Sequence, residues 1–320
     1  MLVLGVDAGG TSSRAALFTV DGTPVGRGHA PGANPVTLGM DHACAHLTAA
    51  VQEAAAASLS HVSAVVLGLA GNPGACRALA GRVLRPLLPQ GPPVRVVGDT
   101  VTAFAAGTSA PSGTVLISGT GAIAAKITNH EQTATADGYG WLLGDEGSGF
   151  WLGHAAARAT IRALTAGSGG RLVALVVRRL LPEGVGEDPV ARLAAAVHAR
   201  PPLALAELAP LVSRAAEAGD PVAQALVAEA AARLAGTAAQ VHEPGLPIVL
   251  AGGVLTSEGP VRRAVHDLLA DAVTAGDAAS GAAWLAAREL LPEADARELH
   301  AAFTKHPDRQ SHRTSRAALP

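Results

Sequence analysis

The stretch LVLGVDAGGTSS, residues 2–13, decides the fold of this chain. An apolar run ends in a carboxylate, two glycines and then hydroxyl groups. This order predicts a buried strand that delivers Asp7 to a tight turn, where glycine lets backbone N–H groups approach phosphate oxygens. A carboxylate does not bind phosphate itself, so Asp7 suits a Mg²⁺ ion that bridges the phosphates, usually through water. An ordinary hairpin turn is the alternative interpretation of the same residues.

The same order of elements returns in the second half of the chain. Strand, glycine-rich turn, strand, polar turn and strand occur twice, which we interpret as a divergent internal duplication. The second glycine turn is SGTG, residues 118–121, and the duplication predicts that the two turns face each other across a cleft. The predicted strands are 2–6, 14–20 and 24–29 in the first half, and 114–118, 122–128 and 132–136 in the second.

The remaining elements alternate between helices and short apolar strands. The third of the short strands ends in AGG, residues 251–253, another glycine turn before a helix. Asp99-Thr100 is predicted to cap a helix that runs through Ala106. The other expected strands are 62–69, 94–97 and 247–250, and the other expected helices are 39–58, 74–88, 150–166, 170–180, 189–199, 204–218, 221–242, 258–274 and 277–291.

Length and composition narrow the class of protein. A chain of 320 residues is natural for two domains, and 49% hydrophobic with only 2% aromatic residues indicates an aliphatic, alanine-rich core. The net charge of −2 offers no general attraction for nucleic acid or an anionic membrane. No run approaches about 20 apolar residues and the N-terminus resembles no secretory signal, so we expect a soluble cytoplasmic protein.

Two cysteines, Cys44 and Cys76, are too few for a disulfide framework or a four-thiolate metal site. Both lie in helix-like apolar surroundings and are expected to be buried small hydrophobes. The segment 304–320 has little apolar content and is expected to be a disordered tail.

The three glycine motifs point to one superfamily. DAGGT, SGTG and AGG in this order resemble the actin/hexokinase/Hsp70 ATPase superfamily; they are neither a P-loop, because no Gly-Lys-Ser/Thr follows, nor a Rossmann fingerprint. The stretch GYGWLLGDEGSG, residues 138–149, resembles the N-acetylglucosamine kinase branch, which is grouped with BadF/BadG-type ATPases. The resemblance covers residues 2–290.

This resemblance implies an α/β fold of two ribonuclease-H-like (actin-like ATPase) domains. Each domain is expected to hold a mixed five-stranded sheet, with the nucleotide in the cleft between the domains. The implied boundaries are 1–110, completed by helices from about 277–303, and 111–276 with helical insertions. A homodimer built on the helical second half is compatible with the sequence, which does not fix the oligomeric state.

The resemblance also assigns roles to residues, with ATP and Mg²⁺ as cofactors and Asp7 as the Mg²⁺ ligand, through water. Asp99 matches the catalytic aspartate, which accepts the proton of the attacking sugar hydroxyl; its alternative role is a simple helix cap. Asn34 matches a sugar-binding asparagine, and an Asn-Pro turn is the alternative. The implied sugar-binding residues are Asn34, Asp99, Gly121, Ala122, Gly138, Tyr139, Gly140, Asp145 and Glu146. The implied ATP-binding residues are Gly9, Gly10, Thr11, Ser12, Gly119, Thr120, Gly121, Gly252, Gly253 and, beside the adenine, Ala216.

Two departures from the family pattern lie where the C2 substituent of the sugar is expected. Relatives carry Trp where Tyr139 stands, preceded by two glycines, whereas Asp137-Gly138 precede it here. Some relatives continue SGTG with Ser-Asn, whereas Ala122-Ile123 follow here. These departures leave recognition of the N-acetyl group open.

Two classes of function compete. The first is an ATP-dependent kinase that forms the 6-phosphate of N-acetylglucosamine, with glucosamine, glucose or N-acetylmuramic acid as further candidate substrates. The second is an ATPase that activates a reductase or dehydratase through an iron–sulfur cluster, which the cysteine positions disfavour. A non-catalytic sugar sensor is a third interpretation, but the chain begins at its first strand, with no DNA-binding domain ahead of it. The expected partners are therefore ATP and a small sugar, with no nucleic acid and no membrane.

Overall fold

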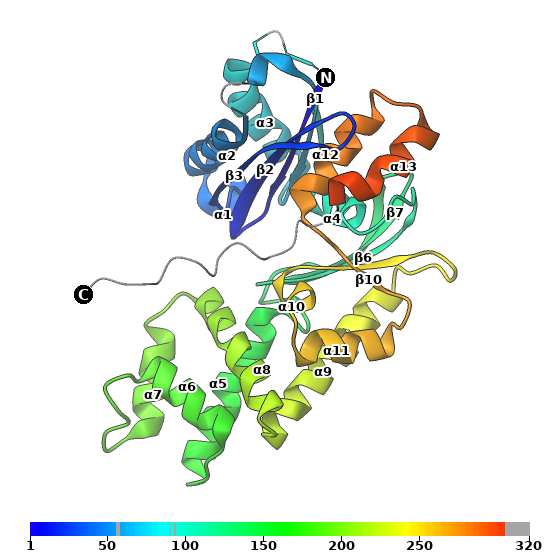
Figure 1. Cartoon of the computed structure of the whole chain (residues 1–320). Coiled ribbons are helices and arrows are strands. Elements are labelled where there is room, and N and C mark those ends of the chain that lie inside the picture. The colour runs from blue at the N-terminus through cyan, green and yellow to red at the C-terminus, as the bar shows by residue number, and fades with distance from the viewer. Residues whose placement is uncertain (56–57, 90, 93, 305–320) are drawn as a thin grey trace, which may run out of the picture. The chain divides into compact units, whose positions relative to one another are not determined.

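The computed structural model of the chain describes residues 1–55, 58–89, 91–92 and 94–304 (Figure 1). The chain divides into two compact units. The first contains Met1–Ser109 and the segment from Gly276 onward, and the second contains Ala110–Ala275. The tail expected over 304–320 lies outside the described residues, except for Thr304, which ends a helix.

Each unit is built on a mixed five-stranded sheet, which confirms the predicted fold class. The strand orders are β3-β2-β1-β4-β5 and β8-β7-β6-β9-β10, with the first three strands of each sheet antiparallel and the last three parallel. The second sheet thus repeats the order and direction of the first. The strands are β1 (Leu2–Ala8), β2 (Ser12–Thr19), β3 (Pro24–Pro31), β4 (Val62–Leu69), β5 (Val94–Gly98), β6 (Gly113–Ser118), β7 (Ala122–Thr128), β8 (Glu131–Asp137), β9 (Ile248–Ala251) and β10 (Val273–Thr274).

Helices cover both faces of the first sheet (Figure 1). Side chains alternate between the faces of a strand, so Leu4 and Val6 of β1 pack in the core with α2 and α3, while Gly5 faces α12. A Cβ atom at Gly5 would overlap the carbonyl of Ala279 and the backbone of Ala283. The helices of this unit are α1 (Pro35–Leu38), α2 (Met40–Ala55), η1 (Leu59–His61), α3 (Pro73–Leu87), α4 (Asp99–Ala105), α12 (Ala278–Arg288) and α13 (Glu293–Thr304).

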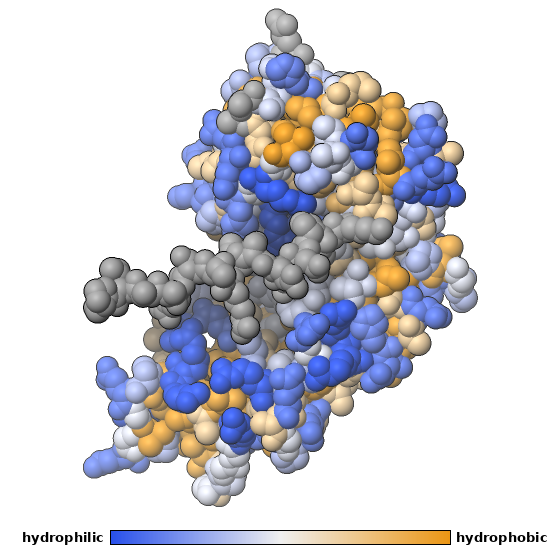
Figure 2. Space-filling model, in the orientation of Figure 1, coloured by the Kyte–Doolittle hydropathy of each residue, from blue (hydrophilic) through white to orange (hydrophobic). Residues whose placement is uncertain are grey.

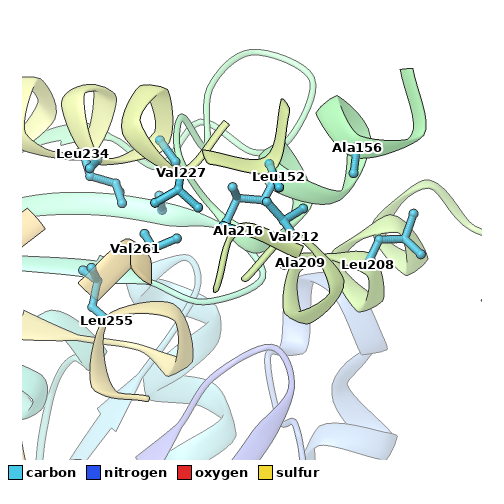
Figure 3. Close-up of a cluster of buried hydrophobic side chains, with 14 of the residues drawn as sticks. Leu152, Ala156, Leu208, Ala209, Val212, Ala216, Val227, Leu234, Leu255 and Val261 are labelled. Atoms are coloured by element: carbon cyan, nitrogen blue, oxygen red, sulfur yellow. The ribbon is translucent and has the colours of Figure 1, made fainter. Parts of the chain in front are cut away.

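The second unit carries a thick helical layer. Figure 3 shows aliphatic and alanine side chains from α5, α8, α9, α10 and α11 converging in its core. This packing agrees with the alanine-rich composition, because small side chains let helices approach closely. The helices are α5 (Gly149–Thr165), α6 (Arg171–Leu180), α7 (Pro189–His198), η2 (Pro202–Leu208), α8 (Ala209–Glu217), α9 (Pro221–Ala239), α10 (Gly253–Thr256) and α11 (Pro260–Leu268).

Two helices differ from the sequence-based expectation. The segment expected as one helix over 204–218 is a 3₁₀ helix followed by α8, because Pro210 has no N–H for an interior helical hydrogen bond and instead sits in the first turn of α8. The helix expected over 258–274 ends at Leu268, and Val273–Thr274 forms β10 instead. Pairing with β9 decides this second case, since a strand of two residues carries no periodicity of its own.

The visible surface mixes hydrophilic and hydrophobic residues, with apolar patches separated by polar ones on the face shown in Figure 2. Among the described residues, no helix combines the length and the apolar character needed to cross a bilayer.

We predict that Gly5→Ala strongly destabilises the first unit, because backbone atoms on α12 leave no room for a methyl group. Overpacking of this kind costs about 1–3 kcal/mol or more. The matched control is Gly81→Ala on α3, where a Cβ meets no described atom within 4 Å and alanine favours the helix. Thermal unfolding should show a lower Tm for the first variant and an equal or higher Tm for the second. Equal melting temperatures for Gly5→Ala and the parent protein would contradict the close strand–helix contact.

Candidate active site

Two carboxyl groups lie at the carboxyl ends of the parallel strands of the first sheet. Asp7 is near the end of β1, and Asp99 directly follows β5 as the first residue of α4. Thr102 on α4 joins them: its hydroxyl lies 2.8 Å from Asp7 Oδ1 and 2.9 Å from the carbonyl oxygen of Asp99. Gly68 on β4 makes this possible, because a Cβ there would overlap the Thr102 side chain.

The expected cap at Asp99-Thr100 is corrected by the structure. The N-cap of α4 is Gly98, which has no side chain, and Asp99 is the first helical residue. Asp99 can occupy this position because acidic groups are favourable in the first turn of a helix.

The electrostatics of these two groups favour their protonated forms. Burial is the main cause that raises the pKa of Asp7 to about 7; the nearby charge of Asp99 contributes to this rise, and the hydrogen bond from Thr102 opposes it. Burial also raises the pKa of Asp99, while the backbone N–H groups of Thr100 and Asp99 oppose the shift. Two half-buried carboxyl groups with raised pKa values at the end of a parallel sheet are typical of a catalytic or cation-binding site.

The turn between β1 and β2 is tied to the segment that follows β3. The Gly9 N–H donates to the Ser12 carbonyl, and its own carbonyl accepts from Ala33. Gly32 donates to the Thr11 carbonyl and packs so closely on Gly10 that a Cβ would overlap its carbonyl. Gly10 and Thr11 are exposed at the tip of the turn, and Ser12 begins β2. The turn is therefore held in place by its backbone hydrogen bonds, and its tip is exposed to solvent.

Asn34 is the N-cap of the short helix α1, because its side-chain oxygen accepts the N–H of Val36 at 2.9 Å. The side-chain NH₂ group of Asn34 takes no part in this cap. The same oxygen would lie 3.0 Å from a Cβ at Gly71, in the loop after β4. Gly71 has a φ of +128°, a conformation that favours glycine. The sequence interpretations of Asn34 as a turn residue and as a sugar ligand are thus compatible.

Asp145 is the central carboxyl group of the second unit. It is 7% exposed, has a left-handed backbone with φ +59°, and accepts the N–H of Ala122 at 3.1 Å. A Cβ at Gly121 would lie 2.8 Å from its carboxylate, so glycine is needed there. Burial raises the pKa of Asp145, the Ala122 hydrogen bond opposes this, and the charge of Asp137 adds to it.

The turn at 119–121 is held from two sides. The Gly119 N–H donates to the Gly121 carbonyl, and the carbonyls of Gly119 and Thr120 accept from Gly149 and Phe150 at the start of α5. Ser148 caps that helix through the N–H of Trp151. The SGTG turn, Asp145 and the N-terminus of α5 therefore form one hydrogen-bonded assembly.

The loop before Asp145 is exposed. Gly138 and Gly140 have positive φ values, and Tyr139 between them is 67% exposed. Glu146 is directed differently from Asp145, because its carboxylate pairs with Arg233 on α9. Arg233 also pairs with Glu229 and lies over the ring of Trp151.

The third glycine turn adjoins the second. Gly252 has a φ of +82°, and a Cβ there would overlap the backbone of Ser118. Gly253 begins α10, where a Cβ would meet no described atom within 4 Å. Ala216 lies at the end of α8, only 5% exposed and packed in the core of the unit (Figure 3).

Sequence reasoning missed three residues of these arrangements. Thr102 carried no signal except its position one helical turn after Asp99. Gly71 could have been found from the duplication, because it follows β4 as Gly252 follows β9. Asp137 was noted only as a departure from the family pattern, yet its carboxylate accepts three backbone N–H groups of the loop beside Asp145.

The model of the BadF/BadG/BcrA/BcrD ATPase family matches residues 4–282. The chain belongs to this family. The resemblance to BadF/BadG-type ATPases inferred from residues 138–149 is thereby confirmed, and the family makes ATP the nucleotide that the protein uses.

Individual proteins are similar to this chain over different lengths. A Chromobacterium violaceum structure, provisionally named an N-acetylglucosamine kinase, is 29% identical with a TM-score of 0.69, covering 89% of this chain and 98% of that one. The N-acetyl-D-glucosamine kinase of Dictyostelium discoideum is 23% identical over 81% of this chain and 86% of its own length. The N-acetylmuramic acid/N-acetylglucosamine kinase of Clostridium acetobutylicum is 33% identical over a shorter match, which covers 33% of this chain and 34% of the relative.

The residues present fit a Mg²⁺ ion held in the way this family implies. Among the described residues, no cluster of three or more His, Cys, Asp or Glu side chains forms an all-protein metal site. Mg²⁺ is commonly bound by one or two carboxylates together with water and substrate phosphates. Asp7 offers one such oxygen ligand at the end of β1, where Thr102 holds its carboxylate by a hydrogen bond.

We predict a pH-dependent stabilisation by Asp7→Asn. Because the pKa of Asp7 is about 7 in the folded protein and 3.8 without the fold, the folded state holds an extra proton between these values. The contribution of Asp7 to stability is therefore full below pH 4 and is lost as the pH rises towards 7. The variant should melt a few degrees above the parent at pH 8 and at nearly the same temperature at pH 4, measured without nucleotide or Mg²⁺.

Asp41→Asn is the matched control, since the Asp41 side chain is 89% exposed and no comparable pH-dependent difference is expected. A parent protein that is as stable as Asp7→Asn at pH 8 would contradict the buried, destabilised carboxylate.

Proposed function

We propose that the protein transfers the γ-phosphate of ATP to the C6 hydroxyl of N-acetylglucosamine. That it is an ATP-dependent kinase rests on the family and on relatives named as amino-sugar kinases over most of this chain. The observation that carries the finer proposal is Asp99, a half-buried carboxyl group with a raised pKa beside Asp7 at the end of a parallel sheet. A primary hydroxyl such as that at C6 is the least hindered nucleophile of the sugar.

Asp99 acts as the general base in this proposal. It accepts the proton of the C6 hydroxyl as the oxygen attacks the γ-phosphorus, while the bond between that phosphorus and the β,γ-bridging oxygen breaks and ADP leaves. A base works best when its pKa lies near the working pH, and burial shifts Asp99 in that direction. The backbone N–H groups at the start of α4 fix the carboxylate, so little reorganisation is needed when the proton is transferred.

Asp7 would hold Mg²⁺, which neutralises charge on the phosphates when bound. Thr102 keeps the Asp7 carboxylate in place by its hydrogen bond. The glycine turns would bind the phosphates through backbone N–H groups and the hydroxyl groups of Thr11 and Thr120, since neither turn carries a lysine or arginine side chain.

Sugar recognition would use the amide of Asn34 and the carboxylate of Asp145. Capping of α1 occupies the oxygen of Asn34 and leaves its NH₂ group to donate to a sugar hydroxyl. The Ala122 N–H occupies one lone pair of the Asp145 carboxylate, and the others can accept from sugar hydroxyls. Asp137 and Gly138 stand where relatives carry two glycines, so the pocket for the C2 substituent is the part of the proposal that the family supports least.

The alternative function, activation of a reductase through an iron–sulfur cluster, is not favoured. Such a cluster needs exposed thiolates at a shared site. Cys76 is buried on α3 and Cys44 is half-buried on α2, where it packs against the core of the first unit.

We predict that sugar-dependent ADP release singles out N-acetylglucosamine from a panel that also contains glucosamine, glucose and N-acetylmuramic acid. Groups that hydrogen-bond the ring hydroxyls reject sugars with altered C3 or C4 by up to about 10⁴-fold. Ala122 and Ile123 offer no side-chain donor near C2, so glucosamine and glucose should follow within roughly 100-fold in kcat/KM. A better rate with glucosamine would contradict this pocket, and no rate with any member of the panel would contradict the proposed function.

We predict that Asp99→Asn lowers kcat by about 10²-fold or more, because the amide cannot accept the proton. The KM for the sugar should change little, since the amide still donates and accepts hydrogen bonds. Glu53→Gln, which removes a carboxylate from α2 in the same unit, is the control and should leave kcat unchanged. Near-normal turnover of Asp99→Asn would move the base to another residue, with Asp145 the next candidate.

A further inference from the structure

Asp137, the last residue of β8, closes the loop that leads to Asp145. Its Oδ1 accepts the N–H groups of Gly138 at 2.8 Å and of Asp145 at 2.7 Å, and its Oδ2 accepts the N–H of Glu146 at 2.8 Å. One carboxylate therefore joins the two ends of the segment 138–146. Hydrogen bonds to a charged acceptor are stronger than neutral ones, so this closure is a substantial constraint.

The backbone around that carboxylate is constrained by close contacts and by unusual φ angles. A Cβ at Gly144 would overlap Asp137 Oδ1, although Gly144 lies outside the left-handed region of φ and so could be alanine on backbone grounds. Asp137 itself has a φ of +61°, as Asp145 has one of +59°. A hydrogen bond from the Asp145 N–H to Asp137 Oδ1 joins these two left-handed residues, and such conformations persist only where the surroundings over-determine them.

The loop would otherwise have little to hold it. Tyr139, Leu142 and Leu143 are 67%, 75% and 79% exposed. Within the described chain, the contacts of residues 139–143 are local: the Gly140 carbonyl accepts from Leu143 and Gly144, and Trp141 packs on Phe150. At the far end of the segment, Asp145 accepts the N–H of Ala122 and Glu146 pairs with Arg233. Asp137 connects both ends of the loop to the sheet, because it pairs with Ile123 of β7 and accepts the N–H groups of Gly138, Asp145 and Glu146.

We propose that Asp137 is a positioning residue for sugar binding, which holds the segment 138–146 so that Asp145 presents its carboxylate beside Gly121 and Ala122. This inference rests on the proposed function, in which Asp145 binds the sugar. This role would explain the departure from the family pattern. Where relatives carry a glycine, the Asp137 carboxylate fixes the loop by three hydrogen bonds.

Asp137→Gly is the direct test, because glycine removes the carboxylate and accepts the positive φ without strain. The KM for N-acetylglucosamine should rise about tenfold, the order expected for losing one or two net hydrogen bonds. The kcat and the KM for ATP should stay within about twofold, since a group that binds substrate and transition state alike affects KM alone. An unchanged KM for the sugar, or a loss in kcat alone, would overturn the proposal.

Gly144→Ala tests the same contact without touching Asp137. Its methyl group should displace the carboxylate and raise the KM for the sugar to a similar extent. In the double variant Asp137→Gly/Gly144→Ala the methyl group has nothing to displace, so the KM should equal that of Asp137→Gly. Effects that multiply instead would show that Gly144 acts independently of Asp137 and would contradict the proposal.

Asn129→Gly is the matched control, because Asn129 also has a positive φ, +53°, but lies at the other end of the β7–β8 hairpin. Hydrogen–deuterium exchange of the peptide covering 138–146 separates the loop from the activity. Exchange should accelerate in Asp137→Gly and Gly144→Ala and stay unchanged in Asn129→Gly. If the parent protein phosphorylates no sugar, the proposed function fails and the sugar role of Asp137 fails with it; if sugars react but exchange is unaltered in Asp137→Gly, the positioning role alone is wrong.

Discussion

The structure depends on placing two acidic side chains, Asp7 and Asp99, at positions where burial disfavours their ionised forms. Asp7 and Asp99 arrive at one sheet edge because β1, β4 and β5 are parallel, and their carboxyl ends coincide. Gly68 makes room for Thr102, which fixes the geometry between them. Burial then raises both pKa values, so the protein is destabilised at the two positions where we propose a base and a cation ligand. Functional sites commonly carry such a cost in stability.

The two units have sheets of the same topology but carry their acidic residues on different elements. In the first, the acidic residue Asp99 follows the outer parallel strand, β5. In the second, the outer strand β10 is short and contributes no comparable acid, and the carboxylate instead comes from the loop after β8. The segment after β3 in the first unit carries no acid in its place, so the loop with Asp145 distinguishes the second unit from the first, as do the helices α5–α9.

Much of the fold could be predicted because its signals are local. The strands 62–69 and 122–128 have the bounds expected from their apolar runs, and the glycine turns marked the ends of β1, β6 and β9. The strand β10 could not be predicted, since its pairing with β9 is a tertiary effect. The break at Pro210 was visible in the sequence but was outweighed by the alanine-rich periodicity around it.

The acidic residues of the candidate site could be predicted from the sequence, but most of their contact partners could not. Motifs indicated Asp7, Asp99 and Asp145, because acids after strands and in glycine-rich loops are visible in the sequence. The partners that orient them were not visible: Thr102 reaches Asp7 across 95 residues, and Arg233 reaches Glu146 across 87. Glu146 and Ala216, both implied by resemblance, lie in an ion pair and in the core respectively, which only packing could show.

We propose that the protein phosphorylates the C6 oxygen of N-acetylglucosamine, and identifying the product tests this proposal. The most direct measurement is ³¹P and ¹H NMR of the product formed from ATP and N-acetylglucosamine. We expect a phosphomonoester whose ³¹P signal is coupled to the two C6 protons of the sugar, with ADP formed in equal amount. Phosphorylation at C1 or another position, or ADP and free phosphate without a sugar phosphate, would contradict it.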